Sequence, residues 1–252
     1  MINHRYRCIF VHIPKTGGKS VNRFFGMHWQ NHKDLFRYSK ELEPQVFASY
    51  FKFAIVRNPW DRMLSDYIFQ TKKNIPGNEK LFVVDDAGHK RRFREWVKVA
   101  LSNPFHYEPC RWGAEVSPGI HRWSPQLDWI SLNGNIAVDS VLRMENLQKD
   151  FEDVCRILGR PAGALPCRNW KFHWHYSHYY DEATERLVGN YYGKDIDAFG
   201  YRFESRKADI RWVMLEKLTT PLQSMARNAL SACAHGDLSI PRASCKARAE
   251  AE

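Results

Sequence analysis

The sequence lacks the long apolar segments and the clustered cysteines that mark several protein classes. No apolar run approaches the roughly 20 residues that a membrane-spanning helix needs, so we expect no transmembrane anchor. Residues 1–15 have neither the apolar core nor the small-residue cleavage site of a signal peptide, which favours a cytoplasmic location. The six cysteines form no Cys-x-x-Cys pair, and their spacing favours neither a zinc site nor a dense disulfide framework.

The composition that is present is typical of a folded protein with affinity for anions. Hydrophobic residues make up 44% of the chain and charged residues 26%, which is far from the composition of a disordered protein. The formal net charge of +10 attracts nucleic acid, acidic membranes, or sulfated, carboxylated or phosphorylated small molecules. Charge alone does not choose between these ligands.

Short β-branched runs alternate with amphipathic helical patterns through most of the chain. The patterns predict strands at 7–13, 51–57 and 140–145, and helices at 93–101, 147–158 and 181–193. This alternation predicts an α/β fold with a central, mainly parallel sheet flanked by helices, in which ligands bind at the carboxyl ends of strands. We expect one domain over residues 1–204 and a helical C-terminal extension with a disordered tail at 205–252.

The segment PKTGGKS (14–20) lies between the first predicted strand and a helical pattern. A strand, a glycine turn and a helix start together present backbone N–H groups and the positive end of the helix dipole to an anion. Gly17 and Gly18 let the backbone approach a ligand closely. Further donors are the side chains of Lys15, Thr16, Lys19 and Ser20. The segment is therefore a candidate phosphate-binding loop.

The ATP- or GTP-binding loop, Gly-x-x-x-x-Gly-Lys-Ser/Thr, is one alternative interpretation. Gly18, Lys19 and Ser20 fit its second half, but Ile13 stands where its first glycine belongs. The segment LFVVDD (81–86) imitates the strand and aspartate that hold magnesium in such enzymes. A P-loop kinase or ATPase stays an alternative, as does a glycine turn without a ligand.

A second motif, RNPWDRMLSDY (57–67), follows another predicted strand. Arg57 ends that strand, and an Asn-capped helix is expected to begin just after it. Ser65 lies two helical turns further on, where it can return to the side of Arg57, and a guanidinium and a hydroxyl together can hold a second phosphate. A structural ion pair of Arg57 with Asp61 or Asp66 is an equal alternative for the arginine taken alone.

With both motifs present, the sequence resembles the sulfotransferases that use 3′-phosphoadenosine 5′-phosphosulfate (PAPS). HIPKTGGKS (12–20) looks like their 5′-phosphosulfate loop, and VRNPWDRMLSDY (56–67) looks like their 3′-phosphate motif. The likeness is greatest to the carbohydrate-directed branch that includes the heparan sulfate 2-O-sulfotransferases, and it runs from about residue 7 to 204.

The resemblance implies a P-loop NTPase-like, three-layer fold and transfer of the sulfuryl group from PAPS to a hydroxyl acceptor, most often on a glycan or glycolipid. It implies no metal cofactor. Related animal enzymes are Golgi proteins, so the Golgi lumen is the expected location if this chain is a trimmed eukaryotic form. Lys15 matches the family lysine that contacts the bridging oxygen. The implied PAPS-binding residues are Lys15, Thr16, Gly17, Gly18, Lys19, Ser20, Arg57 and Ser65.

The acceptor hydroxyl must lose a proton, so a general base is needed near the sulfur. In the resembling enzymes a histidine lies between the two motifs, where this chain has His28 and His32. We prefer His32 because the segment around 31–53 is the most similar to the family, whereas carboxylate bases occur in other sulfotransferases. His12, in the strand before the loop, is expected to be structural.

Other polar segments contain weaker candidates for functional residues. Lys171 and His173, within the aromatic stretch 169–180, are candidate donor contacts, and the histidines there lack the carboxylate or cysteine partners of a metal site. Arg122 and Gln126 can contact the acceptor, although a packed loop is favoured. The remaining Lys and Arg residues are scattered without a basic helix or recognised module, so no nucleic-acid partner is expected.

Overall fold

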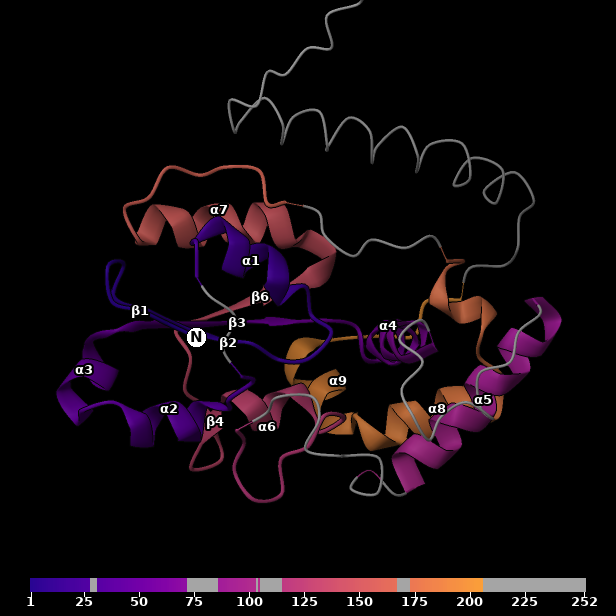
Figure 1. The fold of residues 1–252 in the computed structure, drawn as a ribbon. Helices are drawn as coiled ribbons and strands as arrows, with labels where there is room; N and C mark the ends of the chain where they lie inside the picture. The colour runs from indigo at the N-terminus through magenta and orange to yellow at the C-terminus, as the bar shows by residue number, and fades with distance from the viewer. Residues whose placement is uncertain (28–30, 72–85, 103, 105–114, 167–172, 206–252) are drawn as a thin grey trace, which may run out of the picture.

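The sheet forms from the β-branched and aromatic runs of the sequence. A computed structural model describes residues 1–27, 31–71, 86–102, 104, 115–166 and 173–205. Within these ranges, four strands form one sheet in the order β1-β2-β3-β6. Strands β2, β3 and β6 are parallel, and the short β1 pairs antiparallel with β2. The fold is therefore mixed α/β with a mostly parallel central sheet, as the alternating patterns predict (Figure 1).

The predicted strands and two of the predicted helices appear with tighter bounds, whereas the helix predicted at 93–101 is longer at both ends. The strands predicted at 7–13, 51–57 and 140–145 are β2, β3 and β6, and the predicted helices are α5, α7 and α8. In chain order the elements are β1 (Ile2–Asn3), β2 (Cys8–Val11), α1 (Gly18–Phe24), α2 (Leu35–Glu41), α3 (Pro44–Ser49), β3 (Phe51–Val56), α4 (Pro59–Thr71), α5 (Asp86–Ser102), α6 (Gln126–Ile130), β4 (Ser131–Leu132), β5 (Asn135–Ile136), β6 (Ser140–Arg143), η3 (Met144–Asn146), α7 (Leu147–Ile157), η4 (Tyr176–His178), α8 (Glu182–Tyr191) and α9 (Gly193–Phe199).

One face of the sheet packs on α1 and α7. Successive strand residues point to opposite faces, so Phe10, Phe53 and Ile55 share this side. They pack against Val21 of α1 and Phe151 of α7, all fully buried. Figure 1 shows these two helices together above the sheet.

The opposite face packs on α2, α6 and α9. The alternate strand residues Ile9, Ala54 and Val56 contact Leu35 of α2 and Trp129 of α6 within a second buried cluster. Because both faces are covered, the strands read as continuous apolar runs rather than as an alternating pattern.

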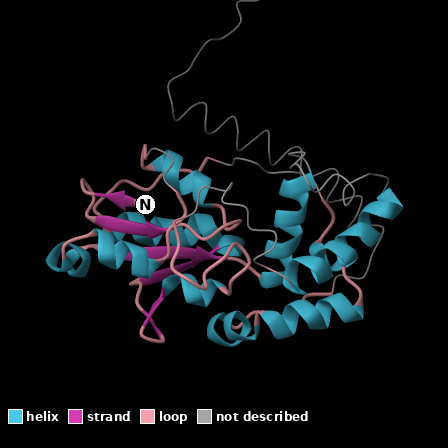
Figure 2. Ribbon diagram, turned by 60° about the horizontal axis from the view of Figure 1, so that its bottom comes forward, coloured by secondary structure: helices cyan, strands magenta, loops and turns pink. Residues whose placement is uncertain are grey.

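Helices α4, α5 and α8, with η4, form a separate helical lobe beyond the carboxyl ends of the parallel strands. Trp60, Tyr67, Phe93 and Tyr192 are among its buried side chains. Figure 2 shows cyan helices on this side of the molecule and the magenta strands on the other. The carboxyl edge of the sheet thus faces α4, which starts directly after β3.

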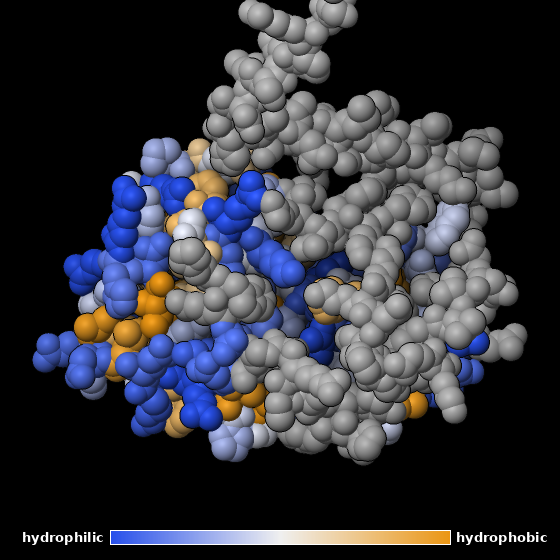
Figure 3. Space-filling view, viewed as in Figure 1, coloured by the Kyte–Doolittle hydropathy of each residue, from blue (hydrophilic) through white to orange (hydrophobic). Residues whose placement is uncertain are grey.

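Two predictions fall outside this description. The segment LFVVDD (81–86), which resembles the magnesium-binding strand of P-loop enzymes, lies almost wholly outside the described residues. The expected C-terminal extension at 205–252 lies outside them from residue 206. None of the helices in the described ranges is long and apolar enough to cross a membrane. Figure 3 shows hydrophilic residues over most of the described surface on the viewed face.

We predict that Phe53→Ala lowers the free energy of unfolding by about 3–5 kcal/mol, the usual cost of truncating a buried phenylalanine. Phe53 is 0% exposed in the central strand β3. The matched control is Phe36→Ala on α2, where the ring is 44% exposed and the loss should be within about 0.5 kcal/mol. Urea unfolding measures both, and equal losses would contradict this assignment of the core.

Candidate functional site

The candidate phosphate loop turns sharply between β2 and α1. Lys15 has φ 69° and Gly17 has φ 85°, so both lie in the left-handed region. For lysine this backbone costs on the order of 1–3 kcal/mol, and it persists only where surrounding contacts impose it. One such contact is the Thr16 hydroxyl, which donates to the carbonyl of Ile13 at 2.9 Å and is fully buried. The Thr16 side chain therefore shapes the loop.

Both glycines of the loop are required by close packing. A Cβ on Gly18 would lie 2.1 Å from Cδ2 of His12, and a Cβ on Gly17 would lie 2.6 Å from Sδ of Met144. His12 follows β2 and Met144 follows β6, so the loop is folded against the ends of two strands. The two glycines are therefore required by the protein's own packing, and their predicted contact with a ligand stays a prediction.

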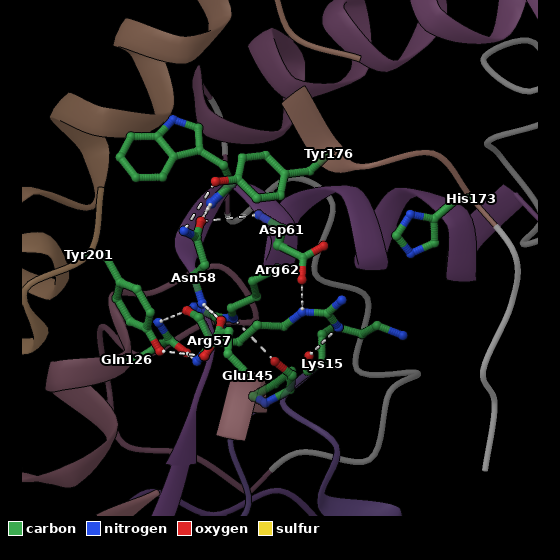
Figure 4. A network of polar contacts seen from close by, with 12 residues as sticks. Lys15, Arg57, Asn58, Asp61, Arg62, Gln126, Glu145, His173, Tyr176 and Tyr201 are labelled. Carbon is green, nitrogen blue, oxygen red and sulfur yellow. Dashed lines mark hydrogen bonds and ion pairs between the residues drawn. The ribbon is translucent and has the colours of Figure 1, made fainter. Parts of the chain in front are cut away.

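Arg57 brings the second motif to this loop. Its Nη1 donates to the Lys15 carbonyl at 3.2 Å, and its Nε donates to Asp61 at 2.8 Å (Figure 4). The two motifs therefore meet at one edge of the sheet. The ion pair with Asp61, left open on sequence grounds, exists and lies within the same group of residues.

The end of β3 is held by side chains distant in the sequence. The Gln126 carboxamide accepts from the Arg57 N–H and donates to the Arg57 carbonyl, each at 2.8 Å. Asp195 in turn accepts from the Gln126 backbone N–H at 2.8 Å and from its carboxamide at 3.1 Å. Gln126 is fully buried, so it positions Arg57. The expectation that Gln126 could contact an acceptor is not supported by these contacts.

Glu145 also fixes this strand end. It accepts from the Asn58 N–H at 2.6 Å and from the Tyr201 hydroxyl at 3.2 Å. Arg143, two residues earlier, donates to the Phe199 carbonyl. Both residues lie at the edge of the site and hold neighbouring chain segments. The Asn58 side chain caps α4 by accepting from the Trp60 N–H, as its motif predicts.

One face of α4 extends from Arg57 towards the lysine of the loop. Asp61, Ser65 and Phe69 follow at intervals of four residues, so they lie on the same side of the helix. Asp61 contacts Arg57, and the Lys15 ammonium lies 4.0 Å from the Phe69 ring centroid. Ser65, half-buried, lies between them on this face. Phe69 was missed on sequence grounds, although its spacing from Ser65 could have indicated it.

Lys15 is strongly affected by its surroundings. Burial lowers the pKa of its ammonium to about 7, the nearby Asp66 carboxylate opposes this, and the charges of Arg122 and Arg57 add to the lowering. A lysine with a pKa near neutrality gains its proton readily when an anion arrives. Lys19 is exposed, with its ammonium 6.0 Å from the same Phe69 ring.

His32 is buried beside the loop and is not an ordinary surface histidine. It is 7% exposed, and its ring centroid lies 4.3 Å from that of His12. Its Nδ1 lies 2.6 Å from the His12 carbonyl, which can only accept, so Nδ1 carries the proton and Nε2 is the basic nitrogen of the neutral ring. Burial lowers the pKa of His32 to about 4; the hydrogen bond to the His12 carbonyl acts against this lowering, and the charge of Arg122 adds to it.

His12 is the neighbour that orients His32. It is buried, and it stacks on Phe10 with ring centroids 5.6 Å apart. Burial, followed by the nearby His32, lowers the pKa of His12 well below its ordinary value. This supports the structural role expected for His12.

The other candidates are more remote or lie outside the described residues. His173 contacts the Trp174 carbonyl through Nδ1 at 2.8 Å, and Figure 4 shows it apart from the Arg57–Asp61 pair, with no contact drawn between them. His28 and Lys171 lie outside the described residues. Among the residues that are described, no group of three or more His, Cys, Asp or Glu is arranged to hold a metal ion.

A known protein family matches most of the chain. The chain matches the family model described as "Sulfotransferase family" over residues 1–202, which spans both motifs and every element described above. No curated protein and no solved structure gives a significant match.

The buried His32 predicts how stability depends on pH. Its pKa is about 4 in the folded protein and 6.5 ordinarily, so the unfolded chain binds more protons between these values. The free energy of unfolding should therefore fall as the pH drops from about 6.5 to about 4. His32→Gln should reduce this slope, measured by urea unfolding at several pH values. The control is His4→Gln at an exposed histidine, and an equal reduction there would contradict the prediction.

Proposed function

The chain belongs to the sulfotransferase family, and we propose that it transfers the sulfuryl group from PAPS to a hydroxyl acceptor, most often on a carbohydrate. The observation that carries the proposal is the contact between Arg57 and the Lys15 carbonyl, because it joins two anion-binding motifs at one edge of a parallel sheet. A nucleotide with phosphates at both its 3′ and 5′ positions needs two such sites. We further propose the P-loop NTPase-like, three-layer class for the fold.

The residues present fit such a donor. In the described part of the chain, the contacts of the Arg57 guanidinium use Nε and Nη1, so Nη2 can donate to a 3′-phosphate oxygen. Ser65 adds a hydroxyl on the same side of α4. The loop, with Lys15, Lys19 and Ser20, is the proposed site of the 5′-phosphosulfate, bound through backbone N–H groups and cations.

The proposed reaction breaks the bond between sulfur and the bridging oxygen of the donor and forms a bond between sulfur and the acceptor oxygen. The bridging oxygen keeps the electron pair and becomes part of the released 5′-phosphate. The Lys15 ammonium is the group that would stabilise this charge. Nε2 of His32 would accept the proton of the acceptor hydroxyl, because Nδ1 already donates to His12. A bound anionic donor would raise the low pKa of His32 and make it a stronger base.

The runner-up function is a P-loop kinase or ATPase. Gly18, Lys19 and Ser20 still fit half of the ATP-binding loop. Phosphoryl transfer from ATP needs magnesium to neutralise the phosphates, whereas the proposed donor site relies on protein cations. Magnesium dependence therefore separates the two functions.

We predict that adenosine 3′,5′-bisphosphate binds in the presence of EDTA, and binds more tightly than ATP with magnesium. Arg57→Ala should weaken this binding by about 10- to 100-fold, because it removes a charged contact to the 3′-phosphate. Isothermal titration calorimetry measures both affinities. The control is Arg156→Ala, an exposed arginine on α7 paired with Asp153. A requirement for magnesium would support the kinase or ATPase instead.

We predict that Lys15→Ala lowers the turnover of sulfuryl transfer by about 10²–10³-fold, the usual loss for a group that stabilises a developing anion. The assay follows labelled sulfate from PAPS to a panel of glycans, glycolipids and small alcohols. Lys40→Ala, at an exposed lysine of α2, should keep the wild-type rate. Near-normal turnover of Lys15→Ala would show that the leaving oxygen is stabilised elsewhere.

A further inference from the structure

The aromatic ring of Phe69 lies against cationic side chains from two parts of the chain. The Lys15 ammonium is 4.0 Å from the ring centroid, and the Lys19 ammonium is 6.0 Å from it. The central carbon of the Arg122 guanidinium lies 5.6 Å from the same centroid. A cation within about 6 Å of an aromatic centroid is attracted by the negative face of the ring. The contact with Lys15 is the shortest of these and therefore the strongest.

The ring is carried by a rigid part of the molecule. Phe69 is half-buried near the end of α4, where its neighbours Tyr67 and Ile68 are buried in the helical lobe. An aromatic side chain on a packed helix has few alternative conformations, whereas lysine has a long and flexible side chain. The ring can therefore set the position of the Lys15 ammonium.

The other end of the Lys15 side chain is fixed by the loop backbone. The Lys15 carbonyl accepts from Nη1 of Arg57 at 3.2 Å, and the residue has φ 69°. The carbonyl of Pro14, just before it, accepts from Nε of Arg62 at 3.1 Å. Arg57 directly precedes the start of α4 and Arg62 lies within it, so one helix holds both the backbone and the ammonium of Lys15.

The Lys15 ammonium is held by an aromatic face, and not by a carboxylate. Burial lowers the pKa of Lys15, and the charge of Asp66 acts against this. The Asp66 carboxylate, however, accepts its hydrogen bonds from Nε of Arg122 at 2.7 Å and from Nε1 of Trp123 at 2.9 Å. A carboxylate in direct contact would neutralise the lysine and repel an anionic ligand, whereas a ring attracts the ammonium without a net negative charge of its own.

On this geometry we propose that Phe69 is a positioning residue for sulfuryl transfer, whose ring face holds the Lys15 ammonium where the leaving oxygen of the donor would lie. The inference rests on the proposed function. Phe69 exchanges no proton and forms no covalent bond, so the balance of the reaction is unchanged. Negative charge develops on the leaving oxygen as its bond to sulfur breaks, so a misplaced ammonium should slow transfer more than it weakens donor binding.

The kinetic test compares Phe69→Leu, which removes the aromatic face, with Phe69→Tyr, which keeps it. Each variant of the full chain is assayed for kcat, for KM with PAPS as the varied substrate, and for Tm. The matched control is Phe36→Leu on α2, because this exposed ring also has a lysine against it, with the Lys40 ammonium 5.2 Å from its centroid.

We expect Phe69→Leu to lower kcat by about tenfold while KM for PAPS stays within about threefold of wild type. Phe69→Tyr and Phe36→Leu should both keep near-wild-type kcat. Equal losses in Phe69→Leu and Phe69→Tyr would overturn the inference, because the aromatic face would then not be the property that matters.

A double-variant cycle tests whether Phe69 acts through Lys15. If it does, adding Phe69→Leu to Lys15→Ala should cause no further loss of kcat, since the ammonium to be positioned is already absent. A further tenfold loss in the Lys15→Ala background would show that Phe69 supports the site by other means, and would overturn the inference.

NMR of the lysine side chains tests the contact without any reaction. Protons above an aromatic face are shifted upfield by the ring current, so the Hε protons of Lys15, assigned with the Lys15→Ala variant, should show this shift. The shift should disappear in Phe69→Leu and persist in Phe69→Tyr. A wild-type Lys15 signal without it would overturn the inference.

These measurements separate failure of the inference from failure of the proposed function. Normal kcat in Phe69→Leu, together with loss of the upfield shift, would overturn the positioning role alone. Wild-type protein that shows the shift but transfers no sulfuryl group would overturn the proposed function, and the positioning role with it.

Discussion

The parallel pairing of β2 with β3 is the constraint on which the site depends. Their register, from Cys8 opposite Phe51 to Val11 opposite Ala54, brings the carboxyl ends of both strands to one edge of the sheet. Only in this arrangement can the guanidinium that follows β3 reach the carbonyl of Lys15 beyond β2. An antiparallel pair would place these two ends at opposite edges. The strand pairing brings Arg57 next to the loop. The packing around the two loop glycines and the hydrogen bonds from Gln126 and Glu145 to the main chain at the end of β3 then fix its position.

Several features at the carboxyl edge of the sheet lower the stability of the folded protein. Lys15 has a left-handed backbone and a buried ammonium whose pKa is about 7. Arg57 and Arg122 lie near it, with Asp61 and Asp66 as their respective partners. Local backbone strain and strongly shifted pKa values are characteristic of functional sites. In the proposed function, the anionic donor carries the charge opposite to that of Lys15 and Arg57.

Helix α4 links the two ends of the proposed donor site through its periodicity. One face carries Asp61, Ser65 and Phe69 and runs from Arg57 to the Lys15 ammonium. The adjacent face carries Arg62 and Asp66, which hold the segment around residue 122 against the loop. A single rigid element therefore sets the separation between the arginine proposed for the 3′-phosphate and the lysine proposed for the transfer, which suits a reaction that depends on positioning.

The sequence by itself determined the local features: the individual strands, the glycine turn, the Asn58 cap and the helical stripes. Each of these follows from residue spacing and backbone preference over a few residues. Only the tertiary structure decided which side chains meet. The contacts of Gln126 with Arg57, Arg122 with Asp66 and His32 with His12 span 69, 56 and 20 residues. No periodicity encodes such distances, because they arise when separate elements pack, and that packing also turned the Thr16 hydroxyl inward.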